Sequence, residues 1–152
     1  MWRIVVTIIG GTVLFAHAPQ AREVDFATLE VRVEGIRPTP GEIGVALFDS
    51  PKGYPVHIEH AYEEEWVPLQ ARQKTVTVVF EGVPFGEYAV SVIHDENGNR
   101  TLERSRLGFP EEGVGFSNDQ RVKLSAPKFS PAKFPLLEGG QKTIVIQLEY
   151  RD

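Results

Sequence analysis

Cysteine is absent from the 152-residue sequence. Its absence excludes a disulfide framework, a lipid-modified cysteine anchor and a cysteine nucleophile, so packing and strand pairing must stabilise the fold. Positive charge is also scarce, because 16 lysines and arginines stand against 21 acidic residues and the formal net charge is −5. Nucleic-acid phosphates require a basic surface, and the sequence contains no run of basic residues. We therefore expect no nucleic-acid partner.

A continuous apolar run occurs at the N-terminus. One arginine, at position 3, precedes an apolar stretch over residues 4–15, and residues 16–18 are Ala-His-Ala. This layout is typical of a signal peptide, and the stretch is shorter than the roughly 20 residues that span a bilayer as a helix. Cleavage after Ala18 leaves Pro19 at the next position, which signal peptidases disfavour, and Ala21 is the alternative. We predict a signal peptide over residues 1–21, cleaved near 18–21, export to the periplasm or the cell exterior, and no permanent membrane anchor.

Helical periodicity is scarce as well, and alternation of apolar and polar residues recurs in its place. A content of 41% hydrophobic and 24% charged residues is typical of a soluble globular protein, and residues 22–152 suffice for a single domain. Strands are predicted over 29–34, 43–48, 75–80, 87–94 and 143–150, with short, proline-interrupted strands over 121–124 and 129–134. Residues 51–72 break the pattern, and we expect a long connection with one helical turn there.

These short strands, separated by Gly and Pro turns without a helical crossover, predict an all-β fold. We expect an antiparallel β-sandwich of six to eight strands, Ig-like in architecture, in which 29–34 and 43–48 form a β-hairpin across the turn at 37–41. Apolar residues with a strict period of two are expected to point into the core. They are Val31, Val33, Val45, Leu47, Val76, Val78, Tyr88, Val90, Val92, Ile144, Ile146 and Leu148.

The segment that follows the strand at 87–94 carries oxygen-bearing side chains at alternate positions. Asp95, Asn97 and Asn99 occupy relative positions 1, 3 and 5, Thr101 offers its carbonyl at position 7, and Glu103 stands at position 9. Hard cations such as Ca²⁺ take six to eight oxygen ligands, and this spacing matches half of an EF-hand scheme. The spacing therefore predicts a weak calcium loop, and no other cofactor is expected.

The same segment has a second interpretation. Its sixth position is Arg100 where an EF-hand has glycine, and its twelfth is Arg106 where an EF-hand has a bidentate glutamate. Asp and Asn are also common turn residues, because their side chains bond nearby backbone amides. A purely structural turn thus stays open beside the calcium loop.

Two segments, 88–99 (YAVSVIHDENGN) and 108–118 (GFPEEGVGFSN), resemble the DUF2141 family of exported bacterial proteins. The resemblance extends over essentially the whole of residues 22–152 and implies no established activity. In the family pattern a glycine often follows the second Asn and an aspartate often stands at the last acidic position, so Arg100 and Glu103 depart from it. The strand and loop are also similar to prealbumin-like and Cna B-type sandwiches, some of which hold calcium in such loops.

The remaining polar and aromatic residues of this region suggest a surface for a ligand or partner. The residues proposed for it are His94, Phe109, Glu111, Phe116 and Asn118. The alternative is a compact loop over 108–118, pinned by its two phenylalanines. A function without catalysis follows as the expectation: a binding or structural module of the cell envelope, with an envelope protein or a glycan as partner.

Two catalytic or metal alternatives also arise from histidines. His94 beside Asp95 would be the base of a hydrolase, but no serine stands in a nucleophile-elbow context. His57 and His60, three residues apart and followed by an acidic run over 63–65, suggest a transition-metal site. We favour an exposed acidic helical turn for the second pattern, since further ligands are missing nearby.

Overall fold

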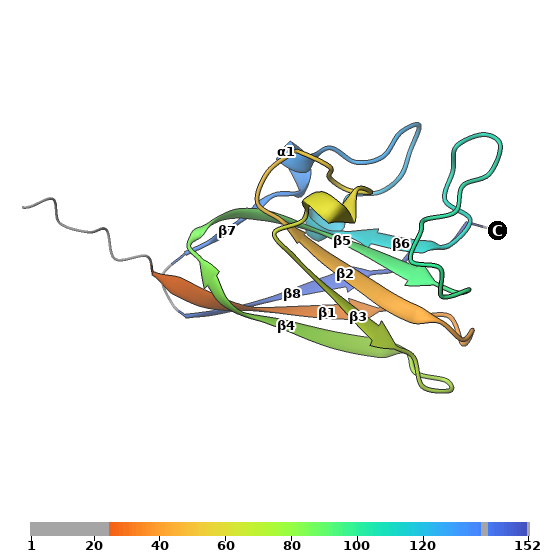
Figure 1. Cartoon of the computed structure of the whole chain (residues 1–152), viewed down its shortest axis with the longest axis horizontal. Coiled ribbons are helices and arrows are strands. Elements are labelled where there is room, and N and C mark those ends of the chain that lie inside the picture. The colour runs from red at the N-terminus through yellow and green to blue at the C-terminus, as the bar shows by residue number, and fades with distance from the viewer. Residues whose placement is uncertain (1–24, 138–139, 152) are drawn as a thin grey trace, which may run out of the picture.

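The computed structural model describes residues 25–137 and 140–151, and the predicted signal peptide lies outside them. These residues form eight strands and three short helical turns (Figure 1). The strands are β1 (Phe26–Glu34), β2 (Glu42–Phe48), β3 (Glu63–Pro68), β4 (Thr75–Pro84), β5 (Gly86–Asp95), β6 (Gly113–Phe116), β7 (Phe134–Leu136) and β8 (Gln141–Gln147). The helical turns are η1 (Ile58–His60), η2 (Ser117–Asp119) and α1 (Phe129–Ala132). Among the described residues, no helix has the length and apolar content needed to cross a membrane.

The strands form two sheets that pack face to face as a β-sandwich, which confirms the predicted fold class (Figure 1). One sheet has the order β4-β1-β8, and the other has the order β3-β2-β5-β6, with β7 also paired to β5. All pairings between these strands are antiparallel except that of β1 with β8, which is parallel. The first and last strands therefore lie side by side in one sheet.

The core lies between the two sheets and is built from alternating apolar residues, as predicted. Eleven of the twelve residues that were expected to point inward belong to the buried cluster, and Ile144 is half-buried against it. On β1, for example, Leu29, Val31 and Val33 are each fully buried, whereas the intervening Glu30 and Arg32 face outward. Burial of one face of each strand is what fixes the register of the pairing.

The predicted hairpin between the first two strands is wrong. Both edges of β1 are occupied, by β4 on one side and β8 on the other, so β2 has no edge of β1 to pair with. The connection crosses from one sheet to the other, with Gly35 at φ +75° and Ile36 buried in the core. Because β1 is already paired on both sides, the next strand, β2, lies in the opposite sheet.

The exposed helical turn predicted around His57 and His60 is confirmed, but its extension over the acidic run at 63–65 is wrong, because that run lies in a strand. A helical turn exists just before it, as η1, but Glu63, Glu64 and Glu65 begin β3. This strand pairs only with β2 and forms an edge of the five-stranded sheet. Charged side chains on an edge strand discourage pairing with another molecule, which explains how so acidic a segment occurs in a sheet.

Two further boundaries differ from the prediction after β5. Residues 121–124 form no strand, and the predicted strand at 129–134 is replaced by α1 and the short β7. A strand that was not predicted, β6, instead contributes to the larger sheet. Gly113 and Gly115 lie on its inward face, where an added Cβ would collide with Tyr150 and with Ile146, respectively. Along β6, glycine therefore alternates with apolar residues, and the usual alternation of apolar and polar residues is absent.

Candidate ligand-binding site

The outer face of the five-stranded sheet has small side chains at its centre. Gly44 and Ala46 on β2 lie beside Ser91 on β5, and Val114 and Phe116 of β6 continue the same face. The Ser91 hydroxyl donates a hydrogen bond of 2.9 Å to the carbonyl oxygen of Pro55, in the connection between β2 and β3. The small residues thus leave a mostly apolar floor on which neighbouring segments can rest.

One side of this floor is bordered by Trp66 of the edge strand β3. Trp66 is the register partner of Gly44, and its indole lies over that glycine. A Cβ added at Gly44 would approach the ring atom Cζ3 to 2.5 Å, which is closer than real Cβ contacts. Glycine at this position therefore allows the aromatic ring to lie close against the sheet.

Three connections rise around the floor and enclose a cavity of about 370 Å³. They are the β2–β3 connection, the β5–β6 connection and the segment after η2 (Figure 1). The polar and charged residues of the wall include His57, Glu59, Glu64, Arg100 and Arg104. A concave, largely apolar space of this size with a few polar groups is typical of a small-molecule site.

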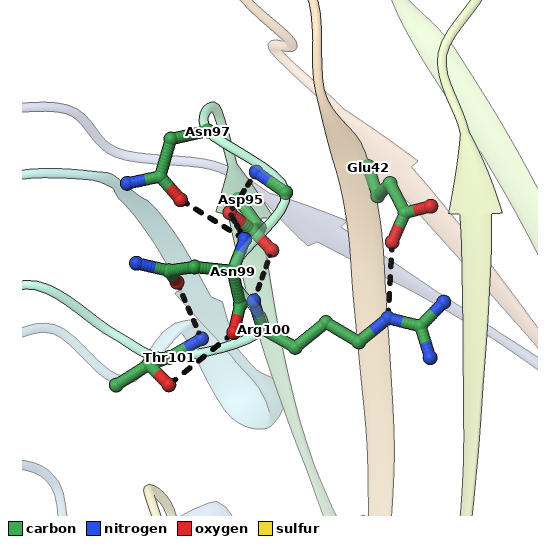
Figure 2. Close-up of polar contacts among 7 residues, drawn as sticks. Glu42, Asp95, Asn97, Asn99, Arg100 and Thr101 are labelled. Carbon is green, nitrogen blue, oxygen red and sulfur yellow. Dashed lines mark hydrogen bonds and ion pairs between the residues drawn. The ribbon is translucent and has the colours of Figure 1, made fainter.

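The β5–β6 connection follows Asp95, the last residue of β5, whose carboxylate holds the turn in shape. One carboxylate oxygen accepts the backbone N–H groups of Gly98 at 2.8 Å and Asn99 at 3.3 Å, and the other accepts that of Arg100 at 2.6 Å (Figure 2). Asp95 has no exposed surface. Backbone amides form stronger hydrogen bonds with a carboxylate than with a neutral acceptor, so these three bonds hold the turn in one conformation.

The turn directs Arg100 across the outer face of the sheet. Arg100 has a left-handed backbone conformation, with φ 55°, and its Nε donates to the Glu42 carboxylate at 3.2 Å (Figure 2). Its guanidinium carbon lies 5.2 Å from the centroid of the Trp66 ring. The Asp95 turn, the start of β2 and the tryptophan of β3 thus meet beside the cavity.

A second buried carboxylate, Glu112, ties the far end of the same connection to its start. Its two oxygens accept the backbone N–H groups of Glu96 and Glu103, each at 3.2 Å. Burial raises the pKa of the Glu112 carboxyl, although the two amide hydrogen bonds act in the opposite direction. Hydrogen bonds to Asp95 at its start and to Glu112 at its end thus hold the connection as a closed loop.

The five residues of the predicted calcium loop all lie in this closed connection. The side-chain oxygens of Asn97 and Asn99 accept the N–H groups of Asn99 and Thr101, at 3.0 and 2.8 Å. Their amide nitrogens both donate to one oxygen of Glu103, at 2.7 and 3.0 Å. These bonds bring the side chains of positions 3, 5 and 9 together, while the described residues contain no cluster of three His, Cys, Asp or Glu residues suited to a metal. The calcium loop stays a prediction.

His94 and Asp95 point in opposite directions from β5. His94 is fully buried on the inward face, with Nδ1 2.8 Å from the Tyr150 hydroxyl, which also accepts the backbone N–H of Arg37. Burial lowers the pKa of His94, although Glu96 among others acts in the opposite direction. The histidine therefore contributes to the end of the core, and the aspartate to the turn on the other face.

The residues of the predicted partner surface do not form one surface. Phe116 lines the cavity, whereas His94 is buried on the opposite side of its sheet. Phe109 lies beneath the Arg151 guanidinium, 3.7 Å from the ring centroid, and Asn118 donates to backbone carbonyls at the end of α1. Glu111 is exposed. Of the five, only Phe116 is placed in the cavity wall.

Sequence reasoning missed Trp66 and Arg100 as neighbours in one site. From the sequence, Trp66 was assigned no role in a site, and Arg100 was considered only as a departure from the EF-hand pattern. Their proximity depends on the pairing of β3 with β2. The acidic start of β3 lacks the alternation of apolar and polar residues from which a strand can be predicted. The available signal was Gly44 within an otherwise apolar strand, since such a glycine often marks close approach of another group.

The fold and the cavity define an all-β sandwich protein with a loop-walled pocket on the outer face of one sheet. Residues 31–145 match the DUF2141 family model, described as an uncharacterized protein conserved in bacteria, and the chain belongs to this family. The resemblance found in the sequence is thereby confirmed. Neither a curated protein nor a solved structure matches the chain.

Proposed function

We propose that this protein is an exported, non-enzymatic binding module of the bacterial cell envelope, and that its ligand occupies the outer-face cavity. The observation that carries the proposal is the cavity of about 370 Å³ with an apolar floor and two arginines in its wall. An apolar floor favours a nonpolar part of the ligand, and guanidinium groups favour an anionic part. The natural ligand is expected among anionic envelope compounds, acidic glycans included.

The separation of His94 from Asp95 supports a role without catalysis. A hydrolase that used this pair would need the imidazole to reach a substrate and the carboxylate to orient it. The imidazole is fully buried against Tyr150, and the carboxylate accepts three backbone amides on the other face of the strand. The hydrolase alternative would therefore require both groups to leave their partners.

Fluorescence of Trp66 provides a test of the cavity. The sequence has two tryptophans, so Trp2→Phe leaves Trp66 as the only one. We expect anilinonaphthalene sulfonate, which is aromatic and anionic, to accept energy from Trp66 in a saturable titration. Ala46→Leu fills the floor and should weaken this binding at least about tenfold, since an added isobutyl group in a packed site displaces its occupant.

A matched leucine on the opposite sheet controls for added hydrophobicity. Thr143 is exposed on β8, and Thr143→Leu should leave the titration unchanged. Equal binding by the wild type and by Ala46→Leu would place the probe outside the cavity and remove the support for this function.

We also propose that the loop from Asp95 to Glu103 binds Ca²⁺ weakly. The specific observation in favour is the left-handed Arg100 at the sixth position, where EF-hand loops need a sharp turn that glycine normally makes. Only two of the five proposed ligand residues are acidic. We therefore expect a dissociation constant of roughly 10⁻⁴ to 10⁻³ M, the range of extracellular calcium modules.

Calcium should then raise the thermal stability of the protein. At a tenfold excess over the dissociation constant, binding to the folded state alone adds about 1.4 kcal/mol. Differential scanning calorimetry in chelator and in calcium measures this difference, and magnesium at the same concentration should give less. Glu103→Gln should abolish the effect, whereas Glu111→Gln, at an exposed neighbouring site, should retain it. If the melting curves with and without calcium coincide, the loop is a turn alone.

A further inference from the structure

Two loop tips expose leucine to an unusual degree. Leu107 is 83% exposed and Leu124 is 96% exposed, the highest values among the large hydrophobic residues that the structure describes. Leu107 lies within the β5–β6 connection, and Leu124 within the segment between η2 and α1. Single exposed apolar residues are common, but neither of these leucines has a place in the core or in the cavity wall.

Both leucines are flanked in the sequence by basic residues, although the chain as a whole is acidic. Residues 104–109 include Arg104 and Arg106, residues 121–128 include Arg121, Lys123 and Lys128, and neither segment contains an acidic residue. Arg121 pairs with Glu149 at 3.0 Å, and Arg104 donates to the carbonyl of Gly108 within its own loop. The two tips thus concentrate five basic residues in a chain whose net charge is −5.

The fold brings these separate segments to the same side of the molecule. Both extend beyond the outer face of the five-stranded sheet (Figure 1), and both contribute to the wall of one cavity. Arg104 lines that cavity from one loop, and Val122 and Ala126 line it from the other. We name residues 104–109 and 121–128 together the basic tips.

We propose that the basic tips dock the protein reversibly on the surface of a bilayer that contains anionic phospholipid. Basic side chains are attracted to anionic headgroups, and apolar side chains beside them insert into the interfacial region. The basic tips contain five basic and no acidic residues, whereas the chain as a whole is acidic, so these two segments are complementary to an anionic surface. The inference is independent of whether the cavity binds a ligand, and its test measures a different signal.

A cysteine-free chain permits a site-specific test of insertion. Leu107→Cys and Leu124→Cys, each in the full chain and labelled with the polarity-sensitive fluorophore NBD, report on the environment of the tips themselves. Vesicles of phosphatidylglycerol and phosphatidylethanolamine should shift NBD emission to shorter wavelength and increase it at both positions. Phosphatidylcholine vesicles should produce a much smaller change, and doxyl-labelled lipid should quench the inserted label.

A label on another surface controls for adsorption through other parts of the chain. Val145 is 53% exposed on the outer face of the three-stranded sheet, and NBD at Val145→Cys should not respond to either vesicle. A response at Val145 equal to that at the tips, or equal responses to anionic and neutral vesicles, would overturn the proposal.

Charge reversal tests the electrostatic part of the mechanism. Arg106→Glu combined with Lys123→Glu should raise the lipid concentration for half-maximal response at least about tenfold, because attraction at two positions becomes repulsion. Arg72→Glu with Lys74→Glu changes the net charge equally at exposed positions of the β3–β4 connection and should have little effect. High salt should weaken docking of the wild type.

An acidic protein is the competing occupant of the basic tips. If the labels at positions 107 and 124 respond to polyglutamate but not to phosphatidylglycerol vesicles, the tips bind an acidic polypeptide and the bilayer proposal is wrong. If the labels respond to vesicles and the reversal of charge at 106 and 123 makes no difference, the electrostatic mechanism is wrong.

Discussion

Asp95→Ala is expected to lower the free energy of unfolding by about 3 kcal/mol, because three backbone amides lose a buried carboxylate. The residue has no exposed surface, and its two oxygens accept the N–H groups of residues 98, 99 and 100. Water can replace part of these bonds in an exposed loop, which keeps the loss below the sum of three full bonds. Urea denaturation in the presence of chelator measures the effect without any contribution from calcium.

Two further variants separate the carboxylate from the rest of the side chain. Asp95→Asn retains one acceptor oxygen and should cost about half as much as Asp95→Ala. Asp49→Ala, at an exposed position just after β2, should change stability by less than about 0.5 kcal/mol. If Asp95→Ala is as mild as Asp49→Ala, the backbone alone holds the turn and the Asp95 carboxylate does not stabilise it.

Ser117→Ala is expected to cost about 2 to 3 kcal/mol, since it leaves buried backbone groups without partners. The Ser117 hydroxyl accepts the N–H of Val90 at 2.9 Å and donates to the carbonyl oxygen of Ala132 at 2.7 Å. Val90 and Ala132 are both fully buried. This one hydroxyl therefore joins β5, the start of η2 and α1, just before the segment that walls the cavity.

The matched control is Ser130→Ala, which removes an exposed hydroxyl from α1. It should change the midpoint of urea denaturation very little, whereas Ser117→Ala should lower it clearly. Equal midpoints for the two variants would mean that water satisfies the groups that Ser117 is described as joining.

The sequence predicted the strands whose two faces differ in polarity. In β1, β4 and β8, burial on one face requires an apolar residue at every second position, and this requirement is visible in a single segment. The edge strand β3 has no such requirement at its acidic start, and β6 satisfies its inward face with glycine. Neither could be recognised from local alternation.

Pairing partners were harder to predict than strands. The expected hairpin between 29–34 and 43–48 followed from a short turn between neighbours in the sequence. The parallel pairing of β1 with β8 joins segments at opposite ends of the described chain, and it occupies the edge that the hairpin required. Nothing in either segment alone indicates this long-range competition for an edge.

The candidate site was predicted in part. The turn that the sequence indicated after Asp95 is present, because Asp and Asn at alternate positions bond nearby backbone amides. The cavity beside it depends on three connections and on the register of Trp66 with Gly44, all of which are products of the tertiary fold. A local motif thus located the region but not the space that it encloses.

Binding of an envelope ligand in the outer-face cavity can be measured residue by residue with NMR spectroscopy. A ¹⁵N-labelled sample would be titrated with a small-molecule extract of the bacterial envelope. We expect chemical-shift changes concentrated in the cavity, with the outer face of the β4-β1-β8 sheet unaffected. The residues expected to respond are Gly44, Ala46, Trp66, Ser91 and Phe116. Changes confined to the outer face of the β4-β1-β8 sheet, or none at any extract concentration, would contradict binding in the cavity.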